Sequence, residues 1–251
     1  FYSFSKPFSD NDSYSVDLSK RNSVHAAINK LSKEKIGAII HLASKMASPE
    51  QAQDMKLLQE NIAITKSIID ILKFLKPEVL LNFSSMSIYP NITGTYSEES
   101  IPGPQNNPDC LYGLSKYCAE VIIDYFLRNE DIRIVHLRVS QVYGEGMRDD
   151  RIIPIMLNEL NESNTITVFG DGKRESNFIE IKQLVKKVQY FLMNDVAGVY
   201  NIGDQNISYI DLAKNYINQY GDKNSTIIKK ARGNNEKFKF DTSKLQSIIK
   251  T

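Results

Sequence analysis

The sequence contains only two cysteines and only three histidines among its 251 residues, and both shortages exclude classes of site. Cys110 and Cys118 provide neither a disulfide framework nor a pair of metal ligands at a known spacing. His25, His41 and His136 are scattered along the chain without further ligands at the spacing of a zinc site. We therefore expect no metal site.

Charge of one sign and long hydrophobic runs are also lacking. The 31 basic and 30 acidic residues are interspersed, so no basic stripe is present and we expect no nucleic-acid partner. No apolar run approaches the roughly 18 residues of a membrane span, and no segment resembles a secretory signal. We expect a cytoplasmic protein without a membrane partner.

Segments typical of helices and strands alternate along the chain. A cap signal at Asp17 precedes a first helix, because Val24, Ile28 and Leu31 fall on one helical face. Further helices are predicted over 49–75, 112–127, 153–160, 182–193 and 209–220, and buried strands over 37–42, 79–83, 132–137, 165–169 and 199–202. Such regular alternation predicts an α/β fold with a parallel sheet covered on both faces.

Polar clusters follow three of the predicted strands. They are His41 to Ser44, Ser84-Ser85 and Ser140-Gln141. Ligands of open parallel sheets bind beyond the carboxyl ends of the strands, so the clusters indicate a site. The alternative is that these side chains only satisfy loop backbone. The longest predicted loop, 91–109, follows Ser85, and long ordered loops are often functional.

Tyr112 and Lys116 lie four residues apart at the start of a predicted helix, one turn from each other on the same face. A neighbouring cation favours the phenolate form of a tyrosine, which makes it a usable acid and base. Tyr2 and Lys6 share the spacing, but they occupy a Ser-rich stretch without apolar periodicity. A solvated surface pair is the alternative for Tyr112 and Lys116. Ser85 at a strand end favours redox chemistry at an alcohol carbon instead.

Several short motifs occur in a fixed order along almost the whole chain. They are Asp17-Leu18, His41-Leu42-Ala43-Ser44, Asn61 in a long helix, residues 83–89 (FSSMSIY), 112–116 (YGLSK), 137–144 (LRVSQVYG), 170–172 (GDG), 200–203 (YNIG) and 241–245 (DTSKL). In this order they resemble the extended short-chain dehydrogenases/reductases of the NAD-dependent sugar epimerase/dehydratase type. The resemblance implies a Rossmann-type doubly wound parallel sheet and a smaller C-terminal substrate-binding region.

The resemblance also implies roles for individual residues. Ser85, Tyr112 and Lys116 would form a catalytic triad, with Tyr112 and Lys116 also contacting the cofactor. The remaining cofactor-binding residues would be Asp17, Leu42, Ala43, Ser44 and Asn61. The substrate-binding residues would be Ser85, Ser87, Gln141, Arg174 and Arg232, the last at the position of a family arginine that holds the nucleotide diphosphate.

The chain departs from the family pattern at its beginning. It starts at Phe1 without Met, and the glycine-rich turn that binds the dinucleotide pyrophosphate is absent together with the strand and helix around it. We therefore expect about forty preceding residues, the N-terminal βαβ portion of the family fold. The residue that would discriminate NAD from NADP is missing as well, so either cofactor fits, with NAD favoured.

Two further departures concern the reaction. Family dehydratases usually place Asp or Glu after the catalytic hydroxyl, whereas this chain has Met86 and Ser87, which disfavours dehydration. Ser176 stands where relatives commonly have an arginine for the diphosphate. Arg174 is a candidate substitute, and its alternative is a solvated turn residue.

These observations lead to one leading hypothesis, an NAD(P)-dependent nucleotide-sugar epimerase that acts by transient oxidation of a ring hydroxyl. The alternatives are a ketosugar reductase with the same residues and a non-catalytic NAD(P)-binding relative on the same scaffold. Residues 1–144 with 178–203 would form the cofactor-binding domain, and 145–177 with 204–251 the substrate-binding region. In many relatives the helices at 49–75 and 112–127 pair across a two-fold axis, so we expect a homodimer.

Overall fold

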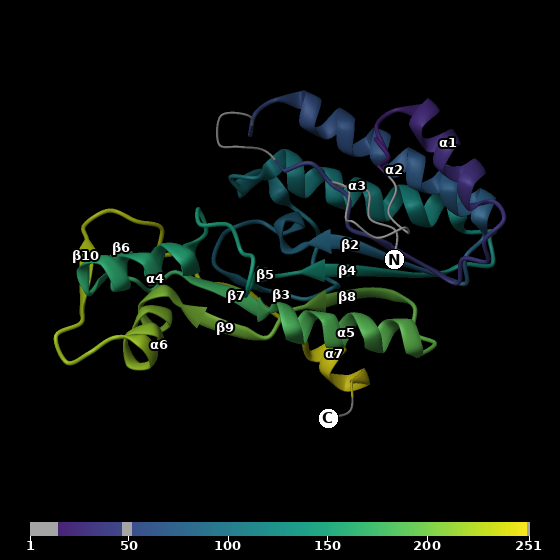
Figure 1. The fold of residues 1–251 in the computed structure, drawn as a ribbon. Helices are drawn as coiled ribbons and strands as arrows, with labels where there is room; N and C mark the ends of the chain where they lie inside the picture. The colour runs from purple at the N-terminus through teal and green to yellow at the C-terminus, as the bar shows by residue number, and fades with distance from the viewer. Residues whose placement is uncertain (1–14, 47–51, 250–251) are drawn as a thin grey trace. The chain divides into compact units, whose positions relative to one another are not determined.

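The computed structural model describes residues 15–46 and 52–249. The chain divides into two compact units (Figure 1). The first unit comprises Phe1–Pro90, Pro102–Arg138 and Phe191–Val199, and the second comprises Asn91–Ile101, Val139–Tyr190 and Tyr200–Thr251.

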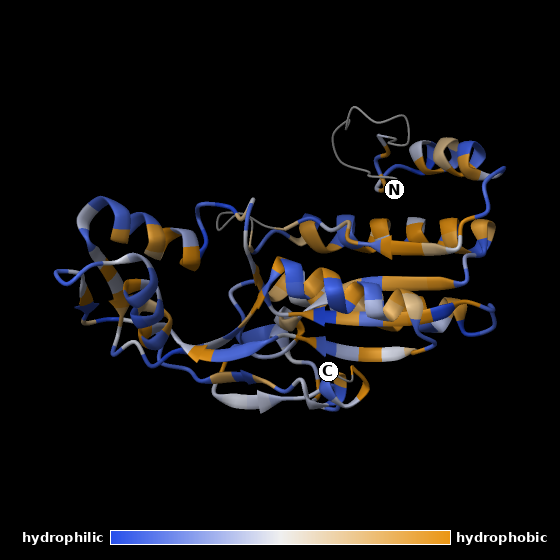
Figure 2. Cartoon of the chain, turned by 60° about the horizontal axis from the view of Figure 1, so that its bottom comes forward, coloured by the Kyte–Doolittle hydropathy of each residue, from blue (hydrophilic) through white to orange (hydrophobic). Residues whose placement is uncertain are grey.

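A four-stranded sheet with strand order β1-β2-β4-β8 lies mostly in the first unit. Its strands are β1 (Ala38–His41), β2 (Val79–Ser85), β4 (Arg133–Val139) and β8 (Gly198–Ile202). β1 and β2 run parallel, with Ala38 opposite Val79 and His41 opposite Asn82. The strands carry long hydrophobic segments (Figure 2), because both faces of such a sheet are packed. The predicted α/β fold with a parallel sheet is confirmed.

Three helices lie together on one side of β2 and β4 in Figure 1: α1 (Arg21–Leu31), α2 (Met55–Leu75) and α3 (Cys110–Leu127). The Asp54 side chain caps α2 by accepting a hydrogen bond from the Lys56 N–H. The helix ends at Lys76, in the left-handed conformation just before Pro77. The predicted start of this helix at residue 49 lies outside the described residues.

The core of the first unit lies between these helices and the sheet. Its innermost side chains come from α2, α3 and β2, and they include Leu72, Leu80 and Ile123, none of which is exposed. α3 is preceded by two short 3-10 helices, η2 (Met86–Ile88) and η3 (Pro104–Asn106). Residue Gly113 allows α3 to pack directly on the end of η2, since its backbone approaches the Ser87 carbonyl.

The second unit contains short strands and four helices among its described residues. The strands are β3 (Gly94–Tyr96), β5 (Gln141–Tyr143), β6 (Thr165–Phe169), β7 (Glu175–Glu180), β9 (Gln205–Ser208), β10 (Thr226–Lys230) and β11 (Phe238–Phe240). They form the sheets β5-β7-β9, β10-β6 and β11-β3. The helices are α4 (Ile152–Ser163), most of α5 (Ile181–Met193), α6 (Tyr209–Tyr220) and α7 (Ser243–Ile248).

The sequence pattern predicted the long elements and missed the short ones. Six strands of the second unit, all except β6, were not predicted, and the predicted loop at 91–109 contains β3 and η3. β7 shows the reason. It contains the buried polar residues Ser176 and Asn177, so no apolar alternation marks it, and its pairing with β5 and β9 fixes it instead.

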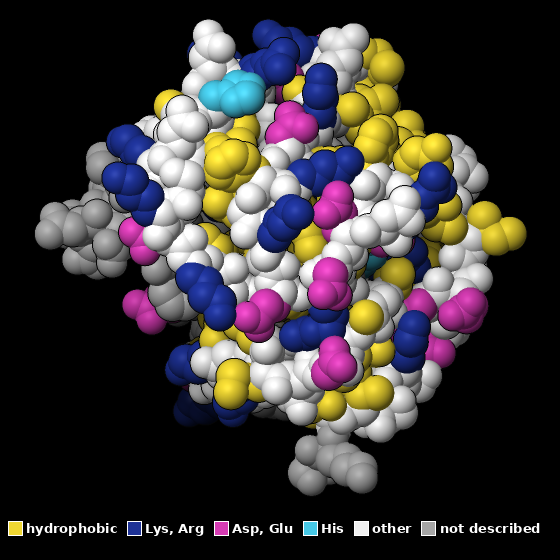
Figure 3. Space-filling view, turned by 90° about the vertical axis from the view of Figure 1, so that its right-hand side faces the viewer, with side chains coloured by type: hydrophobic (Ala, Val, Ile, Leu, Met, Phe, Trp, Pro, Cys, Tyr) yellow, Lys and Arg dark blue, Asp and Glu magenta, His cyan; other side chains and the backbone are white. Residues whose placement is uncertain are grey.

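The surface carries charges of both signs. On the face shown in Figure 3, Lys and Arg side chains are interspersed with Asp and Glu side chains. Among the described residues, no helix combines the length and the apolar character that crossing a membrane requires. The same residues contain no group of three or more His, Cys, Asp or Glu side chains arranged to hold a metal ion.

Candidate active site

Tyr112 and Lys116 occupy the first two turns of α3 and face each other. The Lys116 ammonium lies 5.7 Å from the centre of the Tyr112 ring. Lys116 is only 6% exposed, and its Nζ donates a hydrogen bond of 2.7 Å to the Phe83 carbonyl in β2. A surface pair would be solvated, so the alternative interpretation of a solvated Tyr and Lys is wrong for Lys116.

Burial determines the electrostatics around this lysine. It lowers the pKa of Lys116 to about 8, while the Glu120 carboxylate one turn further along α3 acts in the opposite direction. A pKa of about 8 leaves the ammonium as the main form at pH 7. His41, also buried, has its pKa lowered to about 3 by desolvation and by the Lys116 charge, so it is neutral there.

Ser85 ends β2 and begins the turn that carries Ser87. The Ser85 Oγ accepts a hydrogen bond from the Ser87 N–H at 3.1 Å, which leaves the Ser85 hydroxyl proton available for another acceptor. The turn is pressed against α3, because a Cβ atom at Gly113 would lie 2.0 Å from the Ser87 carbonyl oxygen. This contact holds the serine segment against the helix that carries Tyr112 and Lys116.

The polar clusters at the strand ends behave differently from one another. Ser85 satisfies backbone, as the alternative interpretation expected. Ser84 and Ser140 do not, since their buried hydroxyl oxygens have no hydrogen-bond partner in the described part of the chain. Unsatisfied buried hydroxyls are uncommon in folded proteins and often occur at functional sites.

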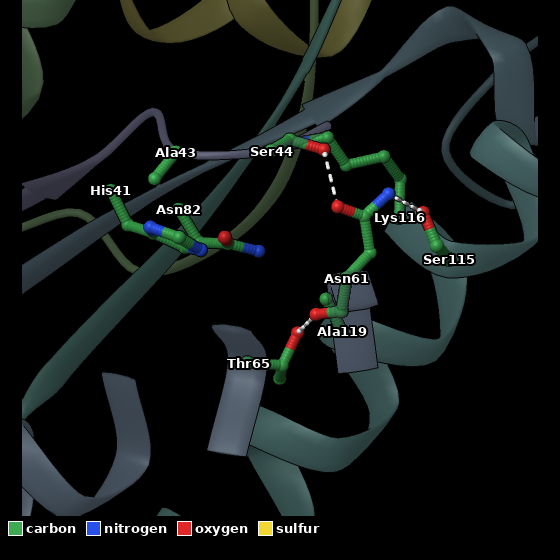
Figure 4. A pocket seen from close by; sticks show the side chains of 9 residues that line it. All are labelled: His41, Ala43, Ser44, Asn61, Thr65, Asn82, Ser115, Lys116 and Ala119. Carbon is green, nitrogen blue, oxygen red and sulfur yellow. Dashed lines mark hydrogen bonds between the residues drawn. The ribbon is translucent and has the colours of Figure 1, made fainter. Parts of the chain in front are cut away.

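A pocket beside Lys116 collects several of the predicted cofactor-binding residues (Figure 4). Its lining consists of His41, Ala43, Ser44, Asn61, Thr65, Asn82, Ser115, Lys116 and Ala119. Asn61 lies between Ser44 and Ser115 and bonds both side chains, at 3.4 and 3.0 Å. It also bonds the Lys45 backbone in both directions, at 2.8 and 3.0 Å, which fixes the loop after β1.

Three predicted cofactor-binding residues, Leu42, Asp17 and Tyr112, are not part of the lining of this pocket. Leu42 is 62% exposed. Asp17 precedes α1 on the surface, where its carboxylate accepts hydrogen bonds from Ser19 and pairs with Lys20. The structure therefore gathers Ala43, Ser44, Asn61 and Lys116 around this pocket, but not Leu42, Asp17 or Tyr112.

A buried ion pair ties the parts of the site together. Arg138 in β4 donates to both carboxylate oxygens of Glu120 in α3, at 2.8 to 3.3 Å, and to the Tyr89 hydroxyl at 2.7 Å. Both charged side chains are almost fully buried. The bidentate geometry suits a guanidinium and links β4, α3 and the segment after η2.

The remaining predicted residues belong to the second unit. The Gln141 amide donates to the Ser176 hydroxyl at 2.7 Å. The Arg174 guanidinium lies 5.2 Å from the centre of the Tyr209 ring, and Arg232 is exposed after β10. Arg174 and Tyr209 also border a pocket of about 240 Å³, whose other lining residues are Ile152, Met156, Thr167, Val168, Phe169 and Asn234.

The chain resembles known proteins over most of its length. The model of the NAD dependent epimerase/dehydratase family matches residues 4–203, which is most of the chain. The chain belongs to this family.

Individual family members show the range of related activities. The chain is 28% identical over 205 residues to dTDP-D-glucose 4,6-dehydratase of Dictyostelium discoideum, covering 76% of the chain and 46% of that protein. It is 26% identical over 229 residues to UDP-glucose 4-epimerase of Mycoplasma genitalium, covering 80% and 66%. The chain thus spans about half to two thirds of the length of these relatives.

A solved family structure shows the same fold. MoeE5 in complex with UDP-glucuronic acid and NAD superposes with a TM-score of 0.77 at 22% identity, covering 97% of the chain and 82% of that protein. At this identity the likeness concerns the fold.

Some residues of the site were not found by sequence reasoning. Asn82, Glu120, His136 and Arg138 are all buried in the first unit. Asn82 interrupts an apolar strand and Glu120 lies one turn after Lys116, so a search for polar residues inside apolar segments would have found both.

Proposed function

We propose that this protein is an NAD(P)-dependent nucleotide-sugar epimerase that oxidises a ring hydroxyl transiently. The observation that carries the proposal is the buried Lys116 beside Tyr112 on α3, with Ser85 at the end of the neighbouring strand. Family membership supports it, because the related proteins act on nucleotide-linked sugars.

The residues around Lys116 fit a dinucleotide cofactor. Among the described residues Phe83 O is the single hydrogen-bond acceptor of Lys116 Nζ, so at least one further N–H group is available for a ribose hydroxyl. Ala43 and Ser44 would line the cofactor path, with Asn61 fixing their loop. When bound, NAD or NADP supplies a hydride acceptor that becomes the donor in the return step.

The chain's own groups handle the proton. Tyr112 takes the proton of the sugar hydroxyl as hydride leaves the same carbon, and it returns the proton when hydride comes back. To accept that proton Tyr112 must begin as the phenolate, which the Lys116 ammonium stabilises. Ser85 donates its free hydroxyl hydrogen to the same sugar oxygen and holds it in place.

The residues after Ser85 bear on whether the reaction is an epimerisation or a dehydration. Elimination of water needs an acid that protonates the leaving hydroxide, and η2 offers Met86, Ser87 and Ile88 at that place. This favours an epimerase over a dehydratase. A ketosugar reductase would use the same Ser85, Tyr112 and Lys116, but it would release the oxidised cofactor after each turnover.

The pocket of the second unit suits the nucleoside part of the substrate. Its volume of about 240 Å³ is below the ~300–1,000 Å³ of pockets that enclose a whole ligand, so it fits one part such as the base. Phe169 and Tyr209 offer aromatic surfaces, and Arg174 offers a bidentate donor for phosphate. Gln141, Ser87 and Arg232 would contact the sugar and the diphosphate.

We also propose the domain roles and a homodimer. Residues 1–144 with 178–203 bind the cofactor, whereas 145–177 and 204–251 bind the substrate. Exposed apolar side chains on α2 and α3 would form the dimer interface, namely Phe74, Val121, Tyr125 and Phe126, each at least half exposed. Light scattering at micromolar concentration should give twice the monomer mass, and a monomer mass would refute the homodimer.

Incubation with a panel of UDP- and dTDP-hexoses and either NAD or NADP tests the function. NMR should show an epimer at equilibrium with its substrate and no net change in the cofactor. Tyr112→Phe should slow this by about 10²–10⁴-fold. Net oxidation of NAD(P)H with a keto sugar would favour the reductase, and no conversion under any condition would favour the non-catalytic relative.

A further inference from the structure

A row of polar side chains crosses the buried sheet of the first unit. His41 in β1 stands opposite Asn82 in β2, and Asn82 Nδ2 lies 2.8 Å from Nδ1 of His136 in β4. All three residues are buried. The row ends at Asp124 in α3, whose Oδ1 lies 2.9 Å from His136 Nε2. Burying polar groups costs stability unless all of them are hydrogen-bonded. A row of buried polar groups inside a sheet therefore suggests a function other than packing.

When His136 is neutral, only one assignment of hydrogen-bond donors and acceptors is possible along this row. An ionised Asp124 only accepts, so His136 carries its proton on Nε2. Nδ1 is then an acceptor, and Asn82 must turn its amide NH₂ group toward it. The Asn82 oxygen is then the polar group that remains for the pocket, which Asn82 lines together with Lys116.

That pocket is suited to one water molecule. It is lined mostly by polar side chains and has room for about one water. Asn82 does not bond Lys116 directly, since Phe83 O is the single acceptor of Lys116 Nζ in the described part of the chain. A water in the pocket would accept from the Lys116 ammonium and donate to the Asn82 oxygen.

We propose that Asp124 and His136 orient Asn82 as a positioning residue for Lys116, through one water molecule bound between the Asn82 oxygen and the Lys116 ammonium. The row orients groups and does not conduct protons, because a carboxamide does not readily pass a proton. The other groups that face Lys116 are Glu120 and the Tyr112 ring on α3 and neutral His41 on β1. The proposal rests on the proposed function only in that the catalytic role of Lys116 comes from it.

NMR of the imidazole nitrogens tests the direction of the row. The chain has only three histidines, so their signals can be assigned by single substitutions. In the unsubstituted protein the neutral form of His136 should carry its proton on Nε2. Asp124→Asn replaces a charged acceptor by a weaker, neutral one that also carries a donor, so the Nδ1-protonated tautomer of His136 should increase. Asp124 is 59% exposed, so this variant leaves the core intact.

Titration of the Lys116 ¹³Cε signal, assigned with Lys116→Arg, tests the effect on the lysine. Asn82→Leu removes the oxygen that supports the ammonium, so the midpoint should fall by about one pH unit or more. Asp124→Asn should also lower the midpoint of the Lys116 titration. This variant provides the test if Asn82→Leu does not fold. Asp131→Asn, the same change at an exposed position of the same unit, should leave it unchanged.

Two results would overturn the proposal. One is a His136 proton on Nδ1 in the unsubstituted protein, and the other is a Lys116 midpoint that neither Asn82→Leu nor Asp124→Asn changes. Both measurements need neither substrate nor cofactor. A failure of this proposal is therefore distinguishable from a failure of the proposed enzyme activity.

Discussion

Replacement of Gly113 by alanine should damage both stability and catalysis, although alanine normally favours a helix. In an unhindered helix Gly→Ala stabilises by about 1 kcal/mol. At Gly113 the new Cβ would lie 2.0 Å from the Ser87 carbonyl oxygen, whereas real Cβ contacts are essentially never under 3.0 Å. The two backbones must therefore separate by about 1.0 Å, the difference between these distances.

The loss of stability follows from the displacement of backbone that the new Cβ requires. Overpacking costs up to about 3 kcal/mol when backbone is displaced, so the net loss after the helix gain is about 2 kcal/mol. For a chain of this size that lowers Tm by about 4–8 °C. A displacement of about 1 Å between Ser85 and Tyr112 should also reduce kcat by about 10²-fold.

Thermal denaturation and steady-state kinetics of Gly113→Ala measure both effects. Gly37→Ala is a matched control, because no atom lies within 4 Å of the Cβ that it adds, and its stability should change by less than about 0.5 kcal/mol. A Gly113→Ala protein that is as stable and as active as the control would refute the packing of η2 on α3.

Three further predictions follow from the charges and pockets. Glu120→Ala leaves Arg138 buried without its carboxylate and should cost about 3–5 kcal/mol, or about 6–20 °C in Tm, whereas Lys214→Ala in an exposed pair should cost at most about 1 kcal/mol. The folded-state pKa of His41, about 3, lies below the ordinary 6.5, so the unfolded chain binds a proton that the folded chain does not. Stability should therefore fall as pH drops from 6.5 toward 3, and urea unfolding of His41→Gln should show a shallower fall; an equal slope would contradict this. Arg174→Ala should weaken inhibition by UDP or dTDP at least tenfold if the nucleotide binds beside it, with kcat little changed.

The sequence predicted those parts of the fold that follow from local residue patterns. The period of α2 and α3 and the apolar runs of β1, β2 and β4 are local, and so is the four-residue spacing of Tyr112 and Lys116. The place of Ser85 at a strand end is local too, and family resemblance added Asn61. These predictions needed no knowledge of distant contacts.

The contacts that shape the site join distant parts of the chain. Asn82 and His136 are 54 residues apart, and Lys116 bonds a carbonyl 33 residues earlier. Neither side chain carries a local signal of its partner. Short strands such as β7 exist because they pair with distant strands, so their polar sequence does not identify them.

The central claim is that the protein oxidises and re-reduces one ring carbon of a nucleotide sugar. A UDP- or dTDP-hexose that carries deuterium at the inverted carbon, incubated in ordinary water with NAD or NADP, tests it most directly. The account predicts an epimer that keeps its deuterium on that carbon, because hydride leaves and returns within one active site. An epimer that has exchanged its deuterium with solvent, or a sugar that is never inverted, would contradict it.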